Sequence, residues 1–260
     1  MSIAQYRWFL LQIAIGFSLV GTTLADDFLI ASRVQVGNDG KNIVESTTMF
    51  HGGRVYDFLA SPDEVTIFDP PGNKFVVLDT EKQIKTEIGT AEIEAFAKKI
   101  QAEALARPVP LLEFLAKPKF DESFDDGSGE LSLVSPWMDY RVKTVPPKQP
   151  DAASKYADFN NWQTKLNTLM RPGSFPPFAR LELNAALDRL HRLPTEVQVT
   201  RYSQHPSKRQ ATIRADHRLQ WRLVDSDLKR IDEVAISLAT FREVSLADYR
   251  AAQGESASGE

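Results

Sequence analysis

The four histidines are the side chains of this chain best suited to acid–base chemistry near neutral pH. They are His51, His191, His205 and His217, and they lie far apart in the sequence with no spacing typical of metal ligands. His217 stands out because it lies on the apolar side of a stretch in which apolar and polar residues alternate. An imidazole buried there could act as a general base or a ligand. The commoner arrangement is a core histidine with one satisfied hydrogen bond, which we expect here.

A group of acidic residues surrounds two glycines between positions 121 and 130. Its members are Asp121, Glu122, Asp125, Asp126 and Glu130. Carboxylates in a flexible loop can bind Ca²⁺, but this spacing does not match the EF-hand loop, which needs alternating oxygen ligands and a bidentate Glu at its end. We therefore expect a solvated acidic loop and no metal site.

Local motifs that carry enzymatic chemistry are absent from the sequence. It contains no G-x-S-x-G, H-E-x-x-H, P-loop or G-x-G-x-x-G motif. It also contains no cysteine, which excludes disulfides, thiol nucleophiles, Cys-ligated zinc and lipid attachment through a cysteine. We predict no catalytic residue and no cofactor.

Basic residues gather between positions 201 and 222. They are Arg201, Lys208, Arg209, Arg214, Arg218 and Arg222. Such a group could contact anionic lipid headgroups or acidic polysaccharide, but its simpler interpretation is the solvated face of a strand. The formal net charge of the chain is −4, which argues against nucleic acid as a partner, because sequence-independent binding needs a basic surface.

The first 25 residues have the order of a secretory signal peptide. Arg7 precedes an apolar run from Trp8 to Val20, and Thr23-Leu24-Ala25 offers a small-x-small cleavage site. The run is shorter than the roughly 18–20 residues that a membrane-spanning helix needs. We expect cleavage before Asp26 and export to the periplasm or the cell exterior, with at most peripheral membrane contact afterwards.

The chain from residue 28 to 88 has the pattern of an antiparallel meander. Short β-prone segments are expected at 28–36, 43–50, 54–59, 65–68, 75–78 and 84–88. The turns between them include Gly52-Gly53, because glycine accepts positive φ, and the proline-containing segment 69–73. Further strands are expected near 131–142, 196–202 and 211–224, the last with clear alternation of apolar and polar residues.

Helices are expected in groups rather than singly between strands. Helical spacing of apolar residues occurs after Thr90, after Asp151, from Phe178 to Leu190 and after Asp225, with a short helix near 111–115. We therefore predict an α+β fold, in which a curved antiparallel β-sheet, a half-barrel-like meander, has helices packed on one face. Residues 26–250 are expected to form one domain, and residues 251–260 a disordered tail.

Aromatic residues of the meander, with two residues of the alternating strand, are candidates for lining an apolar ligand site. The candidate ligand-binding residues are Phe50, Tyr56, Phe58, Phe68, Phe75, His217 and Trp221. They could line a cavity or fill a closed core, and periodicity does not separate these two cases.

The meander resembles the periplasmic lipoprotein-carrier family and related half-barrel lipid-binding proteins of the bacterial envelope. The similar segments are Phe50–Phe58, Glu64–Asp69 and Lys74–Asp79, followed by Thr86. The resemblance covers residues 28–105 and implies a strongly curved antiparallel half-barrel whose concave face is closed by helices and can hold acyl chains. Residues 151–193 depart from the family pattern, and the resemblance transfers no functional residue.

Three functions are compatible with these patterns. Non-catalytic binding of a lipid, a lipidated protein or another apolar ligand predicts a large apolar cavity between sheet and helices. A protein-interaction or structural module predicts a filled core and an exposed apolar patch. A hydrolase with a dispersed site predicts a cleft in which a histidine meets a carboxylate. We place the first ahead and the hydrolase last, because no local catalytic motif is present.

Overall fold

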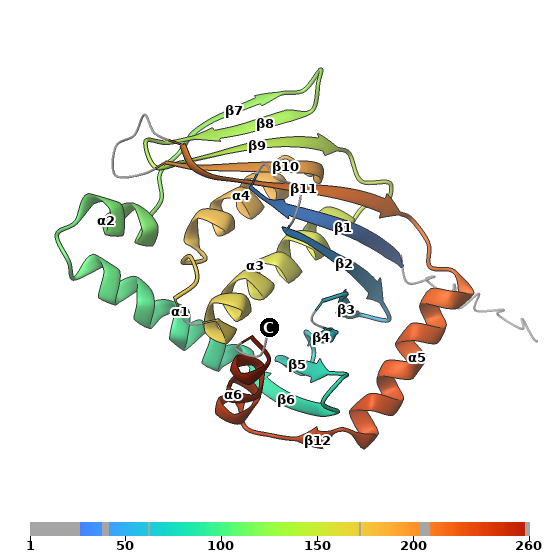
Figure 1. The fold of residues 1–260 in the computed structure, drawn as a ribbon. Helices are drawn as coiled ribbons and strands as arrows, with labels where there is room; N and C mark the ends of the chain where they lie inside the picture. The colour runs from blue at the N-terminus through green and yellow to red at the C-terminus, as the bar shows by residue number, and fades with distance from the viewer. Residues whose placement is uncertain (1–26, 38–41, 62, 172, 203–208, 258–260) are drawn as a thin grey trace, which may run out of the picture.

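The chain forms one open, curved β-sheet that wraps around a group of helices (Figure 1). The computed structural model describes residues 27–37, 42–61, 63–171, 173–202 and 209–257. The predicted signal peptide, His205 and Lys208 lie outside this part of the chain.

Twelve strands of the described residues are hydrogen-bonded into the sheet. Their bounds are β1 Phe28–Val36, β2 Asn42–His51, β3 Arg54–Leu59, β4 Glu64–Asp69, β5 Lys74–Asp79, β6 Ile84–Gly89, β7 Asp121–Asp125, β8 Glu130–Val134, β9 Met138–Val145, β10 Leu193–Tyr202, β11 Arg209–Gln220 and β12 Arg242–Glu243. The order across the sheet is β12-β6-β5-β4-β3-β2-β1-β11-β10-β9-β8-β7. Neighbouring strands are antiparallel except β12, which runs parallel to β6.

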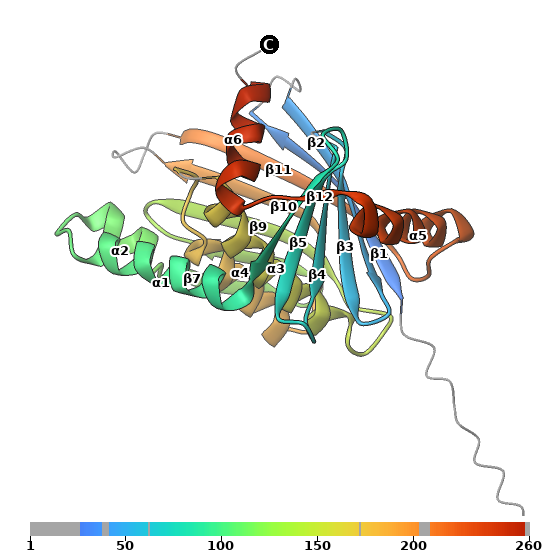
Figure 2. The ribbon, with the colours of Figure 1, turned by 90° about the horizontal axis from the view of Figure 1, so that it is seen from below.

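Six helices within the described ranges accompany the sheet. Their bounds are α1 Thr90–Leu105, α2 Pro110–Ala116, α3 Ala152–Met170, α4 Phe178–Arg189, α5 Asp225–Thr240 and α6 Leu246–Ala257. Helices α1 to α4 lie inside the curve of the sheet, whereas α5 lies outside it (Figures 1 and 2). We call these two sides of the sheet the concave and the convex face.

The middle of the sheet joins two parts of the chain that are distant in sequence. β1 pairs with β2 on one side and with β11 on the other, so the meander β1–β6 and the later strands β7–β11 form one continuous surface. The four helices on the concave face are the two connections between these strands: α1 and α2 link β6 to β7, and α3 and α4 link β9 to β10.

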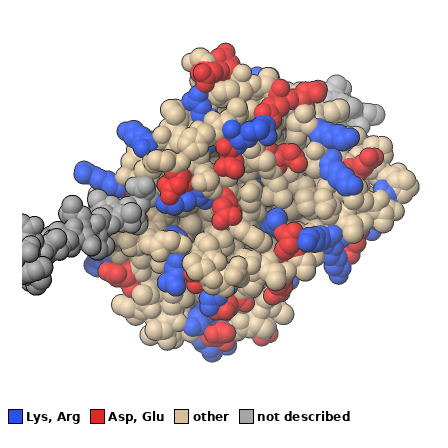
Figure 3. Space-filling model, turned by 180° about the vertical axis from the view of Figure 1, so that it is seen from behind, with Lys and Arg blue, Asp and Glu red and all other residues tan. Residues whose placement is uncertain are grey.

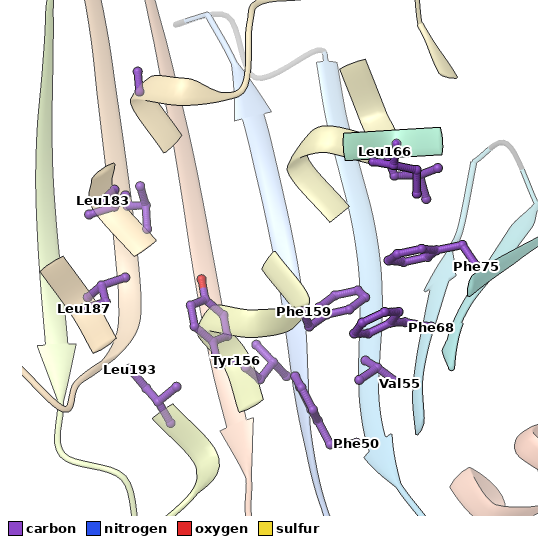
Figure 4. Packing of buried hydrophobic residues seen from close by; sticks show 14 of the residues in the cluster. Phe50, Val55, Phe68, Phe75, Tyr156, Phe159, Leu166, Leu183, Leu187 and Leu193 are labelled. Atoms are coloured by element: carbon purple, nitrogen blue, oxygen red, sulfur yellow. The ribbon is translucent and has the colours of Figure 1, made fainter. Parts of the chain in front are cut away.

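The larger hydrophobic core lies between the concave face and the helices. Phe28 stacks on Phe50 with ring centroids 4.1 Å apart, and Phe68 stacks on Phe75 at 4.5 Å. Phe159 of α3 packs against both Phe50 and Phe68 (Figure 4). Burying each of these rings stabilises the fold by about 1.5–3 kcal/mol, so α3 is a principal source of stability.

A second, smaller core lies between the convex face and α5. Its members are Leu29, Met49, Tyr56, Phe58, Val65, Ile67, Val76, Leu78, Ile231 and Val234. Coverage of both faces explains the continuous apolar run from Phe75 to Leu78, all of which is buried. Such runs are typical of strands covered on both sides, whereas alternation is typical of strands with one solvated side.

The predicted α+β fold with a curved antiparallel sheet is confirmed. Several local expectations were wrong. Asp121–Asp125 forms strand β7 rather than a loop, the strand expected at 211–224 ends at Gln220, and the tail expected from residue 251 continues as helix α6 to Ala257. Helices also cover both faces of the sheet, because α5 packs on the convex side.

None of the helices in the described ranges is both long and apolar enough to span a membrane.

Candidate ligand-binding site on the concave face

The helices do not cover the whole concave face, and one end of β1 shows this directly. Alternate residues of β1 point to the concave side, and their exposure rises along the strand. Phe28 is 0% exposed and Ile30 2%, but Val34 is half-buried and Val36 is 39% exposed. A single strand therefore begins inside the core and ends at solvent.

The neighbouring strands extend this exposed apolar surface. Val44 of β2 pairs with Val34 and is 40% exposed. On the other side, Ala215 and Ile213 of β11 pair with Val34 and Val36 and are half-buried. We call the set Val34, Val36, Val44, Ile213 and Ala215 the mouth. Apolar side chains gathered on a concave surface are typical of a binding site rather than of ordinary solvent-facing structure.

Polar residues lie between the mouth and the core at the centre of the sheet. The Oγ of Ser32 is 2.8 Å from Nδ1 of His217, its partner on β11. Burial, reinforced by the positive charge of Arg180, lowers the pKa of His217 to about 4. The imidazole is therefore neutral at pH 7, and its Nε2 has no hydrogen-bond partner among the described residues.

Arg180, at the start of α4, links the helices to this polar region. Its Nε donates to Oδ1 of Asn184 at 2.9 Å, and its Nη2 donates to the hydroxyl of Tyr156 on α3, also at 2.9 Å. Asn184 is fully buried and donates to Asn161, 2.9 Å away. These contacts join α3 to α4, and the acceptors of the Arg180 guanidinium are neutral groups.

Arg201 of β10 is a second cation on the concave side. Its guanidinium lies 5.1 Å from the ring centroid of Phe175, in the connection between α3 and α4. Burial raises the pKa of Tyr140 to about 12, although the charges of Arg201 and Arg180 act in the opposite direction. Both guanidinium groups are therefore near this phenol. Arg201 pairs with Ala211, beyond Ile213 of the mouth, so these polar residues border the mouth on both sides. We call Ser32, His217, Arg180, Tyr140 and Arg201 the polar band.

The convex face carries a different kind of hollow. A groove of about 770 Å³ lies beside α5, and charged residues from β1, β2, β11 and α5 line it. Arg33 and Glu45 form an ion pair of 3.6 Å within it. The charged lining does not suit an apolar ligand, so the concave mouth is the better candidate for one.

The seven ligand-binding residues expected from the sequence lie on two faces. Phe50, Phe68 and Phe75 lie in the concave core, with Trp221 packed against it and His217 in the polar band. Tyr56 and Phe58 instead belong to the convex core, which corrects their assignment to the same apolar face. They alternate with the concave residues of β3, and side chains of successive strand residues point to opposite faces.

The buried aromatic residues of this set fill space rather than line it. Phe50, Phe68 and Phe75 are at most 4% exposed and pack against α3 (Figure 4). Residues 151–193 provide helices α3 and α4, which pack on the concave side.

The histidine–carboxylate pair that a hydrolase would need occurs elsewhere. Nδ1 of His51 lies 2.7 Å from Oδ2 of Asp27, whereas Nδ1 of His217 contacts the hydroxyl of Ser32. The pair borders a shallow pocket of about 90 Å³, and the described residues lining that pocket include no Ser or Thr nucleophile.

The acidic group is not arranged as a metal site. Glu122 pairs with Arg189 at 2.5 Å, and Asp126 pairs with Arg192. Oδ1 of Asp125 accepts backbone hydrogen bonds within its own turn. No cluster of metal-ligating side chains occurs in the parts of the chain that the structure describes.

The basic run divides between the two faces of the sheet. Arg214 is exposed and pairs with Glu196 and Asp216, whereas Arg201 faces the concave side. On the side of the molecule shown in Figure 3, acidic and basic side chains are interspersed rather than gathered by sign.

Sequence reasoning missed Arg180 and Tyr140, and it assigned Arg201 to the wrong environment. Arg180 lies in a helix whose pattern predicts burial of apolar residues only, and its partners come from a different helix. The one indication in the sequence was that Arg201 lies two and four residues from the apolar Val199 and Val197, which places all three on the same face of β10.

In comparisons with known proteins, the sequence matches no family model and no curated protein.

Proposed function

We propose that the chain is a non-catalytic carrier that binds an apolar ligand, of the acyl-chain class, at the mouth and along the concave face. The observation that carries this proposal is that the concave residues of β1 run from the buried Phe28 to the exposed Val36 and are apolar except for Ser32. Contact with a ligand would remove this surface from water, and each Å² of apolar surface buried contributes about 25 cal/mol of favourable free energy.

The dimensions of the uncovered surface suit an elongated ligand. The four residue steps from Ser32 to Val36 span about 13 Å at roughly 3.3 Å per residue. Beyond Ser32 the concave side is filled by α3 and its contacts, so the ligand lies along this stretch.

The test is a fluorescence titration with N-phenyl-1-naphthylamine, a neutral apolar probe. Val44→Glu places a charge in the mouth, and Ile236→Glu is the matched control because Ile236 lies on α5 and is 65% exposed. We expect saturable binding to the native chain and to the control. Val44→Glu should weaken binding by about tenfold, a loss of ~1.4 kcal/mol of binding free energy. This loss is smaller than the free energy gained by burying a complete Val side chain.

Two results would count against the proposal. Equal affinity of Val44→Glu and the control would place the probe elsewhere. Absence of binding to the native chain would favour the interaction-module alternative, because the concave core beneath α3 is already closely packed.

A further inference from the structure

Two arginines on the concave side lack the partners that arginines usually have. In the described residues, no carboxylate lies within ion-pair distance of Arg180 or Arg201. Arg180 donates only to an amide oxygen and a phenol, and Arg201 lies against the Phe175 ring. Both arginines are half-buried, and charges withdrawn from water in proteins are normally paired because that withdrawal is costly.

The convex face shows that this chain does pair its arginines elsewhere. Arg33 pairs with Glu45, and Arg214 pairs with Glu196 and Asp216, although these side chains are largely exposed. The half-buried Arg180 and Arg201 have no such carboxylate among the described residues. An anion from outside the chain would supply the missing counter-charge.

Other polar atoms near the two arginines also lack partners. Nε of Arg201 and Nε2 of His217 are buried without a hydrogen bond in the described part of the chain. When the Ser32 hydroxyl donates to Nδ1 of His217, Nε2 carries the proton and is a free donor.

We infer that the apolar ligand carries an anionic head group, a carboxylate or a phosphate, which Arg180 and Arg201 bind at the polar band while the chain lies along the mouth. This inference rests on the proposed function and adds the head group to it. Guanidinium groups suit both anions because their donors match two oxygens at once.

The test compares ligands that share one chain and differ in the head group. Displacement of N-phenyl-1-naphthylamine is measured at pH 7.4 with dodecanoate, dodecyl phosphate and the neutral dodecanamide. We expect both anions to bind at least tenfold more tightly than the amide. Isothermal titration calorimetry with inorganic phosphate tests whether the anion alone is sufficient, and we expect no measurable binding.

Variants assign the preference to the two arginines. Arg201→Gln and Arg180→Gln should each reduce the preference for dodecanoate over dodecanamide by at least threefold. Arg214→Gln is the matched control, because this arginine is exposed and already paired with carboxylates, and it should leave the preference unchanged. If circular dichroism shows that Arg180→Gln does not fold, the head-group preference of Arg201→Gln alone tests the inference.

Each result supports or overturns the inference. If the amide binds as tightly as the anions, the head-group inference fails while the apolar site stands. If inorganic phosphate binds as tightly as dodecyl phosphate, the site binds a free anion and the amphiphile is excluded. If neither the probe nor any ligand binds, the proposed function fails as well.

Discussion

Acidification should destabilise this protein through His217. Burial lowers the pKa of His217 to about 4, against 6.5 for an unperturbed histidine. The folded protein therefore binds this proton less readily than the unfolded chain does. The free energy of unfolding is unaffected by this residue above pH 6.5 and falls as the pH drops from 6.5 towards 4.

The magnitude follows from the two pKa values. Each pKa unit corresponds to about 1.4 kcal/mol, so the contribution of His217 is limited to about 3.5 kcal/mol. At pH 5 the unfolded histidine is almost fully protonated while the folded one is about one-tenth protonated, and the loss relative to pH 7.5 is about 2 kcal/mol.

Urea denaturation followed by tryptophan fluorescence measures this loss at pH 7.5 and pH 5. Other groups titrate in the same range, because burial raises the pKa values of Asp57 and Glu64, which favours the folded state at low pH. The relevant quantity is therefore the difference between the native chain and His217→Gln. The native chain should lose about 2 kcal/mol more than the variant, and an equal loss in both would refute the reasoning.

Three substitutions test the packing and turns that hold the site. Phe75→Ala removes a fully buried ring stacked on Phe68 and should lower the free energy of unfolding by about 3–5 kcal/mol in urea denaturation. Gly129→Ala should cost at least about 1–2 kcal/mol by the same assay, because residue 129 has φ +70° and an added Cβ would lie 2.6 Å from a backbone oxygen. Tyr249→Phe removes the hydroxyl 3.1 Å from Glu64 and should lower the thermal midpoint, with a cost of about 1–3 kcal/mol, while a neutral effect would show that water replaces the hydroxyl.

Local patterns predicted the meander well because its turns and strands are short-range features. Gly52 and Gly53 do adopt positive φ, +58° and +76°, at the hairpin between β2 and β3. The alternation on β11 correctly placed His217 towards the interior. Both features depend on residues that are adjacent in the sequence, so periodicity is sufficient to find them.

Coverage of the sheet could not be predicted in the same way. The run Phe75–Leu78 indicates burial on both faces, but it does not say which helix covers which face. Tyr56 and Phe58 were therefore assigned to the wrong side, since α5 follows them by more than 160 residues and packs on the convex face.

The polar band depended on contacts that no local pattern encodes. Ser32 and His217 are 185 residues apart, and Arg180 meets Tyr156 across two helices. The acidic composition of residues 121–125 likewise favoured a loop, and pairing with β8 overrode that tendency. Such tertiary pairings often outweigh intrinsic propensity in strands.

The absence of cysteine from the chain allows the most direct test of where the ligand binds. Val44→Cys places a single thiol in the mouth, and Ile236→Cys places one on α5 outside the sheet. The rate of reaction with 5,5′-dithiobis(2-nitrobenzoic acid) is measured for each variant with and without saturating N-phenyl-1-naphthylamine. We expect at least tenfold protection at position 44 and none at position 236. Equal rates at position 44 with and without bound probe would contradict binding at the mouth.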